Sequence, residues 1–155
     1  MHSTANSGRP QMPLDVYRAW NGCLLAGDFQ GAAKFVDREH WNEKCLGLTG
    51  WLTDFDVAVT HYVTNMVRPW SGLRMSEEDV TEGRDSVTVR FRVEATHVGP
   101  FLGVPATGRR VTFDAVRIVK IGNGLVTGQW AQLDLWGIHQ QLTASPAPDT
   151  EGSRA

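Results

Sequence analysis

The dipeptide Asn123-Gly124 constrains the fold of this 155-residue chain more than any other feature. Asn-Gly between two apolar runs is the strongest short-range signal for a two-residue β-hairpin turn, because both residues adopt positive φ at low cost. The flanking segments, 111–121 and 125–135, are rich in residues that favour strands. We therefore predict two antiparallel strands joined at this turn.

A third strand is predicted by strict alternation earlier in the chain. Val87, Val89, Phe91 and Val93 are separated by polar or charged residues. A period of two places such residues on one face of a half-buried strand. The odd-numbered positions should therefore face the core, both here and in segment 111–121.

The first 70 residues show helical spacing of apolar residues instead. Pro13 suits the first turn of a helix, and Thr53 begins a pattern that resembles a capping box. The predicted helices cover residues 13–26, 28–37 and 53–68, and residues 37–50 are expected to be irregular. Helices followed by antiparallel strands predict an α+β fold.

Length and composition predict one domain over residues 13–143. The ends, 1–12 and 144–155, are rich in Ser, Pro, Gly and charge, so we expect disordered tails. A formal net charge of −2 gives no basic excess for nucleic acid or an anionic membrane. There is no signal-peptide pattern and no apolar run of about 20 residues, so we expect a cytoplasmic protein.

Metal and nucleotide chemistry find little support in the sequence. Cys23 and Cys45 are not at metal-ligand spacing and are expected to be buried free thiols. The histidines at 40, 61 and 139 have no partner at ligand spacing. A Gly-x-Ser-x-Gly elbow, a phosphate loop and a dinucleotide fingerprint are all missing. We expect neither a metal nor a cofactor.

Strand pairing predicts which polar side chains face the core. A two-residue turn places three pairs of residues opposite one another: Arg117 and Trp130, Ala115 and Gln132, and Phe113 and Asp134. Only a bulge would reverse these faces. The odd face therefore holds Arg117, Gln132 and Asp134, with His97 joining them if the earlier strand extends that far.

Two interpretations of these buried polar groups stay open. In one, Arg117 and Asp134 form an ion pair that closes the sheet while His97 bonds a loop carbonyl. In the other, the same groups form a reactive site. The six tryptophans, together with Tyr62 and Met66, likewise suit either a core or the wall of a pocket for a flat ligand.

Several motifs between residues 95 and 142 carry a family resemblance. They are Thr96-His97-x-Gly99, Phe101-Leu102-Gly103, Pro105-x-Thr107-Gly108-Arg109, Gly124, Trp130, Asp134 and Gln141-Leu142. This pattern resembles the SnoaL-like polyketide cyclases and related ester cyclases of the nuclear transport factor 2-like superfamily. The resemblance implies a cone-shaped, curved antiparallel sheet around three amino-terminal helices, one pocket as in ketosteroid isomerases, and no metal or organic cofactor.

The resemblance also implies a function in polyketide or antibiotic biosynthesis. Members close a ring of a polycyclic polyketide-like substrate by intramolecular aldol chemistry with acid/base catalysis. By position, Asp134 and His97 are the implied catalytic residues, with Gln132 or Arg117 polarising an oxygen. The other implied substrate-binding residues are Trp130, Tyr17, Trp41, Tyr62, Met66 and Phe113. Many members carry an acid directly after the tryptophan, where this sequence has Ala131.

Other functions in the superfamily remain alternatives. Relatives isomerise double bonds, open epoxides or hydroxylate polycyclic aromatics without a metal, and a non-catalytic small-molecule-binding protein is a further possibility. The resemblance also implies a homodimer or higher homo-oligomer through the outer face of the sheet. Val116 and Ile118 make that face apolar at mid-strand, which agrees with this expectation.

Overall fold

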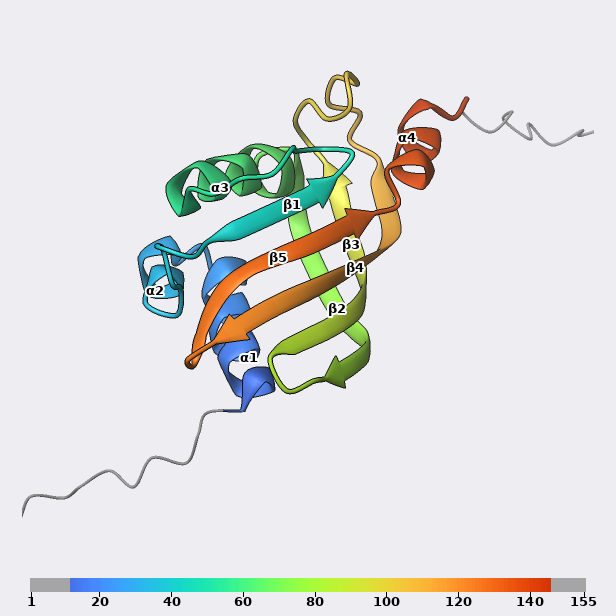
Figure 1. Ribbon diagram of the computed structural model, residues 1–155. Helices are drawn as coiled ribbons and strands as arrows, with labels where there is room; N and C mark the ends of the chain where they lie inside the picture. Colours follow the sequence, from blue (N-terminus) through green and yellow to red (C-terminus); the bar gives the residue numbers. More distant parts are fainter. Residues whose placement is uncertain (1–11, 146–155) are drawn as a thin grey trace, which may run out of the picture.

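The computed structural model describes residues 12–145, which form a curved five-stranded sheet with helices on both of its sides (Figure 1). The elements in chain order are α1 (Pro13–Leu25), α2 (Phe29–Ala33), β1 (Asn42–Leu46), α3 (Phe55–Tyr62), η1 (Val63–Val67), β2 (Trp70–Glu82), β3 (Ser86–His97), β4 (Arg110–Gly122), β5 (Leu125–Leu133) and α4 (Leu135–Thr143). The predicted α+β class and the three amino-terminal helices are confirmed. The predicted tails lie outside the described residues, apart from positions 12, 144 and 145.

The sheet is mixed and has the order β1-β5-β4-β3-β2. β2 to β5 pair antiparallel with their neighbours, as predicted for the hairpins, but β1 pairs parallel with β5. The prediction of a wholly antiparallel sheet is therefore wrong at this edge. β1 lies in the stretch that was expected to be irregular, and five residues are too few for alternation to reveal a strand. β2 and α4 were not predicted either.

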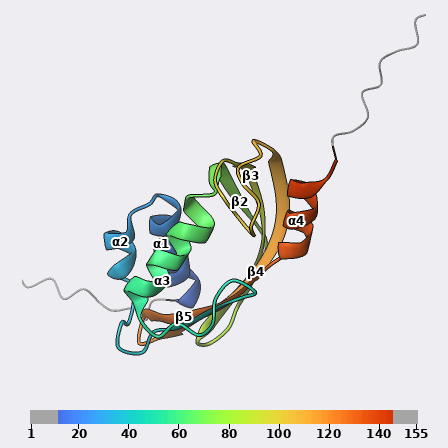
Figure 2. The ribbon, with the colours of Figure 1, turned by 90° about the horizontal axis from the view of Figure 1, so that it is seen from above.

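The sheet bends around α1 and α3, which cover its concave face (Figure 2). The odd positions of β3 and β4 point into this space, and Val87, Val89 and Val119 are completely buried there. Helix α4 packs beside β4 on the other side, where the side chain of Gln141 bonds both the backbone N and O of Thr112. None of the helices within residues 12–145 is long and apolar enough to cross a membrane.

The β4–β5 hairpin turns at Asn123-Gly124, as predicted, with φ of 51° and 75° at the two positions. Gly122 pairs with Leu125 and Ile121 with Val126, but the next pair is Lys120 with Gly128. Thr127 is therefore an extra residue, and this β-bulge reverses the faces of all later positions of β5.

The bulge overturns part of the predicted inward face. Arg117 lies opposite Ala131 instead of Trp130. Gln129, Ala131 and Leu133 now face the concave side, whereas Trp130, Gln132 and Asp134 lie on the outer side of the sheet. The prediction that these last three side chains point inward is wrong.

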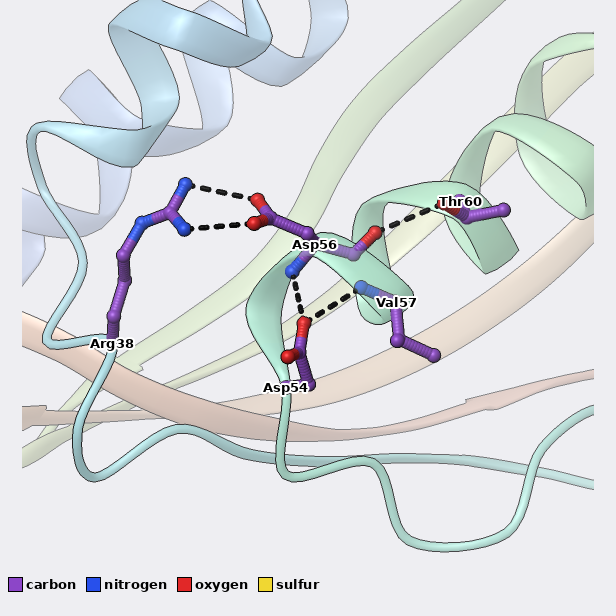
Figure 3. A network of polar contacts seen from close by, with 5 residues as sticks. All are labelled: Arg38, Asp54, Asp56, Val57 and Thr60. Atoms are coloured by element: carbon purple, nitrogen blue, oxygen red, sulfur yellow. Dashed lines mark hydrogen bonds and ion pairs between the residues drawn. The ribbon is translucent and has the colours of Figure 1, made fainter.

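Helix α3 is fixed at its start by three acidic or basic side chains (Figure 3). Asp54 caps the helix by accepting from the backbone N of Asp56 and Val57 at 2.8 and 3.0 Å, so the cap lies one residue after the predicted Thr53. Arg38 forms two bonds of 2.9 Å with the carboxylate of Asp56. The loop after α2 is thereby tied to the helix that covers the sheet.

Candidate functional site

A cavity lies between the concave face of the sheet and the helical segment formed by α3 and η1. Its volume is about 80 Å³, several times the roughly 10–15 Å³ that one water needs. Most of its wall is apolar. The polar and ionisable residues in the wall are Glu43, Cys45, Thr49, His61, Tyr62, Asn65, Arg117 and Gln129.

Glu43 enters this cavity from the middle of β1. Alternation along the strand places Glu43 and Cys45 on the inner face, and Glu43 is only 9% exposed. Its backbone N and O both pair with Leu52 at 2.8 Å, which fixes the strand on its free side. Removal from water raises the pKa of the Glu43 carboxyl to about 7, although Gln129 and the positive charge of Arg117 act in the opposite direction.

Arg117 projects into the same space from β4 and is 7% exposed. Its Nη2 donates to Oδ1 of Asn21 at 2.8 Å and contacts Sδ of Met75 at 3.3 Å. The guanidinium lies over the rings of Phe91 and Tyr17, with its central carbon 4.9 and 5.5 Å from their centroids. Aromatic faces and one amide thus hold a buried cation in place.

The opposite wall comes from the end of α3 and from η1, a single π-helical stretch. His61, Tyr62, Asn65 and Met66 line the cavity from this segment. Burial raises the pKa of the Tyr62 hydroxyl, so this side chain is a neutral donor at physiological pH. A π-turn widens the helix locally and is frequent at functional sites. In this protein the π-helical stretch carries Asn65 and Met66, which line the cavity opposite the sheet.

The chemistry available in the cavity is proton transfer. A carboxyl with a pKa near 7 exists in both protonation states near neutrality, which is what a general acid/base needs. Burial and the neighbouring Glu43 raise the pKa of Cys45 to about 11, so its thiol stays protonated and is a poor nucleophile. Both cysteines are free. Within residues 12–145, no three His, Cys, Asp or Glu side chains are grouped to hold a metal.

Three of the residues expected from the sequence line the cavity: Arg117, Tyr62 and Met66. His97 faces inward, as predicted, but it is fully buried at the end of β3. Its Nδ1 lies 3.0 Å from Oγ1 of Thr107, its ring packs on Trp70, and burial lowers its pKa. His97 is not among the residues that line the cavity.

Three other expected ligand contacts are part of the core. Trp41 packs edge-on against Phe55, with ring centroids 4.9 Å apart, and Phe113 packs against Trp70. Tyr17 is fully buried beneath the Arg117 guanidinium. None of the three lines the cavity.

The remaining three expected site residues, Trp130, Gln132 and Asp134, lie on the far side of the sheet from the cavity. Asp134 is exposed and caps α4 by accepting from the backbone N of Gly137 at 2.9 Å. It makes no ion pair with Arg117, so the sheet-closing pair considered from the sequence does not form.

Sequence reasoning missed six polar residues of the cavity wall: Glu43, Cys45, Thr49, His61, Asn65 and Gln129. Glu43 and Gln129 matter most here, because they are paired on neighbouring strands. Regular pairing from the turn would place Gln129 on the outer face, and the Thr127 bulge turns it inward. For Glu43 a weak signal exists, since Trp41, Glu43 and Cys45 alternate and both Trp and Cys are usually buried. That alternation covers only three positions, and the parallel pairing of Glu43 with Gln129 is needed to make it a strand.

A sequence model of one protein family, the SnoaL-like polyketide cyclases, matches residues 14–142. The chain belongs to this family. It is 27% identical over 150 residues to the aklanonic acid methyl ester cyclases DnrD of Streptomyces peucetius and DauD of Streptomyces sp. strain C5. The match covers 91% of this chain in both cases, with 97% of DnrD and 87% of DauD.

Solved structures of SnoaL-like proteins share the fold. A SnoaL-like protein from Jannaschia sp. CCS1 superimposes with a TM-score of 0.77 at 20% identity, over 92% of this chain and 100% of the other. IdmH from Streptomyces antibioticus gives a TM-score of 0.73 at 18% identity, over 85% of this chain and 99% of the other. An NTF2-like protein from Burkholderia thailandensis also superimposes, with a TM-score of 0.71 at 12% identity over 88% of this chain and 99% of the other. The chain therefore has the nuclear transport factor 2-like fold that its motifs implied.

Proposed function

We propose that this protein is a polyketide cyclase-like enzyme that closes a ring by an intramolecular aldol reaction, with Glu43 as the acid/base. Membership of the cyclase family and the ester cyclases among its relatives support the reaction class. The observation that carries the proposal is the position of Glu43. Among the described residues that line the cavity, it is the only carboxylate, and its pKa lies near 7.

The proposed reaction balances within one substrate molecule. The Glu43 carboxylate removes a proton from a carbon next to a carbonyl and leaves an enolate. The enolate carbon attacks a second carbonyl of the same molecule and forms the new C–C bond. Neutral Glu43 then returns its proton to the resulting alkoxide, so the enzyme ends as it began and no redox partner is needed. The apolar wall holds the chain in the folded geometry that this attack requires.

Glu43 lies where it can replace the acid that this chain lacks at Ala131, directly after Trp130. Ala131 faces the cavity and pairs with Cys45 of β1, and Glu43 lies two residues before Cys45 on the same face. A carboxylate from β1 thus reaches the space beside the position where many family members carry their acid on β5. We propose that Glu43 supplies the acid/base function from the neighbouring strand.

The substrate class proposed here is a multi-ring polyketide-like compound. The cavity volume of about 80 Å³ is well below the roughly 300–1,000 Å³ of ligand pockets in general, so we propose that part of the wall moves on binding. Leu48 and Thr49, in the short loop after β1, belong to the wall and are held mainly by bonds to Cys45. We propose that this loop moves outward when the substrate enters.

The test is turnover of bicyclic and tricyclic polyketide esters by the purified protein, followed by chromatography and NMR because ring closure yields an isomer. We expect conversion by the native protein, and a loss of about 10²–10⁴-fold in kcat for Glu43→Gln. Asp134→Asn serves as the matched carboxylate-to-amide control outside the cavity and should keep its rate. If the protein binds these compounds but converts none of them, a non-catalytic binding protein would be favoured instead.

A further inference from the structure

We infer that the guanidinium of Arg117 is a binding site for an organic anion with a single charged oxygen, a phenolate or an enolate, inside the cavity. The inference rests on the proposed function for its biological meaning, because an enolate is the intermediate of that reaction. It assigns a role to a second group of the cavity, Arg117 beside Glu43, and names the class of anion that this group would bind. Binding can be tested without any turnover.

The first observation is a buried charge with no carboxylate in direct contact among the described residues. None of the ion pairs among the described residues includes Arg117, although it is more than nine-tenths buried. Its Nε is fully buried and has no hydrogen-bond partner. A desolvated cation costs free energy, and a ligand anion beside it would recover part of that cost. Since Arg117 lines the cavity, a ligand there can reach it.

The second observation concerns the number of free donors. A guanidinium binds a two-oxygen carboxylate through one of its two edges, and both edges include Nη2. In this structure Nη2 is already bonded to Asn21 and in contact with Met75. Neither edge is therefore free as a pair of donors. A single charged oxygen needs only one donor, which favours a phenolate or enolate over a carboxylate.

The third observation is the shape and polarity of the surroundings. The rings of Phe91, Tyr17 and Trp20 surround the guanidinium at 4.9 to 6.0 Å. The side chains of Met75 and Val93 continue this apolar surface along the cavity. A planar, conjugated anion in the cavity places its charge on the cation and its ring against Phe91, Met75 and Val93. A small, strongly hydrated anion would lose its water without gaining such contacts.

Glu43 makes the site selective for the state after proton transfer. While Glu43 is ionised, it competes with a ligand anion for the charge of Arg117. Once Glu43 has taken the substrate proton, it is neutral and the negative charge resides on the enolate oxygen. A cation fixed in advance beside that oxygen stabilises the developing charge without reorganisation. The pair is thus complementary to the enolate and not to the ketone.

The probe is 4-nitrophenol, whose phenolate absorbs at longer wavelength than the neutral phenol. The matched controls are 4-nitroanisole, its neutral methyl ether, and 4-nitrobenzoate, a carboxylate. We expect the native protein to bind 4-nitrophenol as the phenolate, so that the long-wavelength band appears at a lower pH than in buffer. Affinity for the phenolate should exceed that for the anisole and the benzoate by on the order of 10–100-fold.

Three variants assign the effect to its residue. Arg117→Met should lose the long-wavelength band and bind the phenolate on the order of 10–100-fold more weakly, with unchanged affinity for 4-nitroanisole. Arg117→Lys keeps a charge and should retain part of the band, which guards against a folding defect in the first variant. Glu43→Gln should tighten phenolate binding. The other ionisable groups near Arg117 are Tyr17 and Tyr62, whose pKa values burial raises, and Glu77 beyond Tyr17.

Equal affinity of the native protein for the phenolate and the anisole would overturn the inference, as would preference for the benzoate. Retention of the ionised band in a folded Arg117→Met protein would overturn it too. The proposed function fails differently. If Glu43→Gln still converts substrate at the native rate while phenolate binding depends on Arg117, the anion site stands and the acid/base assignment falls.

Discussion

At the scale of single residues, the pKa of the Glu43 carboxyl is set mainly by its burial in the cavity. The same side chain on an exposed strand would have an ordinary pKa of 4.5, whereas the cavity raises its pKa to about 7. The charge of Arg117 limits this rise, because a nearby cation favours the ionised carboxyl. The two side chains come from β1 and β4, which are separated in the sheet by β5.

Burial of Glu43 should make stability depend on pH. Below about pH 4.5 the carboxyl is protonated in both folded and unfolded chains and costs nothing. As pH rises from about 4.5 to 7, the unfolded chain ionises while the folded chain keeps its proton, so the fold loses stability, and the loss levels off above pH 7. With about 1.4 kcal/mol per pKa unit, a rise from 4.5 to about 7 corresponds to on the order of 3 kcal/mol. Denaturant unfolding of Glu43→Gln should show a gain of this size at pH 8 and little change at pH 4.

Activity should rise with pH, whereas stability falls. The proposed first step needs the Glu43 carboxylate, so kcat/KM should increase with pH and reach half of its plateau near pH 7. The measurement is initial rate at low substrate across pH 5 to 9. A profile with no inflection between pH 6 and 8 would be incompatible with Glu43 as the base.

Asp134 should behave as a helix cap. Asp134→Ala removes the acceptor for the backbone N of Gly137 and should destabilise the protein by about 1 kcal/mol. Asp134→Asn keeps an acceptor and should unfold close to the native temperature. Rates measured on folded protein should match the native rate for both. A loss of 10²-fold or more in a stably folded Asp134→Asn protein would instead support the role that the family resemblance implied for this residue.

At the scale of elements, the bulge at Thr127 determines which alternate side chains of β5 face the cavity. It lies next to Gly128, which has φ of 154° and directly faces the backbone of β1. A Cβ at Gly128 would overlap the carbonyl oxygen of Asn42. The close approach of β1, the bulge and the inward position of Gln129 are therefore parts of one arrangement.

Gly128→Ala should therefore destabilise the protein strongly, by about 2–4 kcal/mol, since backbone must move to admit the methyl group. The strand that shifts carries Glu43, so turnover should fall as well. Gly22→Ala is the matched control, because a Cβ there meets nothing within 4 Å and the residue lies inside α1. It should be neutral or stabilise by up to about 1 kcal/mol in thermal unfolding.

At the scale of the whole molecule, the curved sheet has one face filled by helices and one face largely open. On the open face Val116, Ile118 and Trp130 are half-buried, and Trp51 and Trp136 are 59% and 68% exposed. An exposed apolar surface of this kind is typical of an interface. We propose that a second copy of the chain covers it, since a two-fold pair buries the same patch on both partners.

Sedimentation at micromolar concentration should show this dimer. Ile118→Arg places a charge at the centre of the patch and should give a monomer, while the cavity on the other face stays intact. Val57→Arg is a control, because Val57 is exposed on α3, away from the patch. A native protein that sediments as a monomer would rule out the proposal.

Local patterns were enough to predict the α+β class, the helices before residue 70, the turn at Asn123-Gly124 and the inward face of β3 and β4, including Arg117. These features depend on local propensity and on periodicity within one segment. The remaining features depend on contacts between distant segments. The Thr127 bulge depends on how closely β1 approaches Gly128, and β1 becomes a strand only by pairing with β5. Glu43 and Gln129 therefore face the cavity, and Asp134 lies on the outer side of the sheet, because of a contact between segments about 85 residues apart. A local sequence pattern does not reveal such a contact.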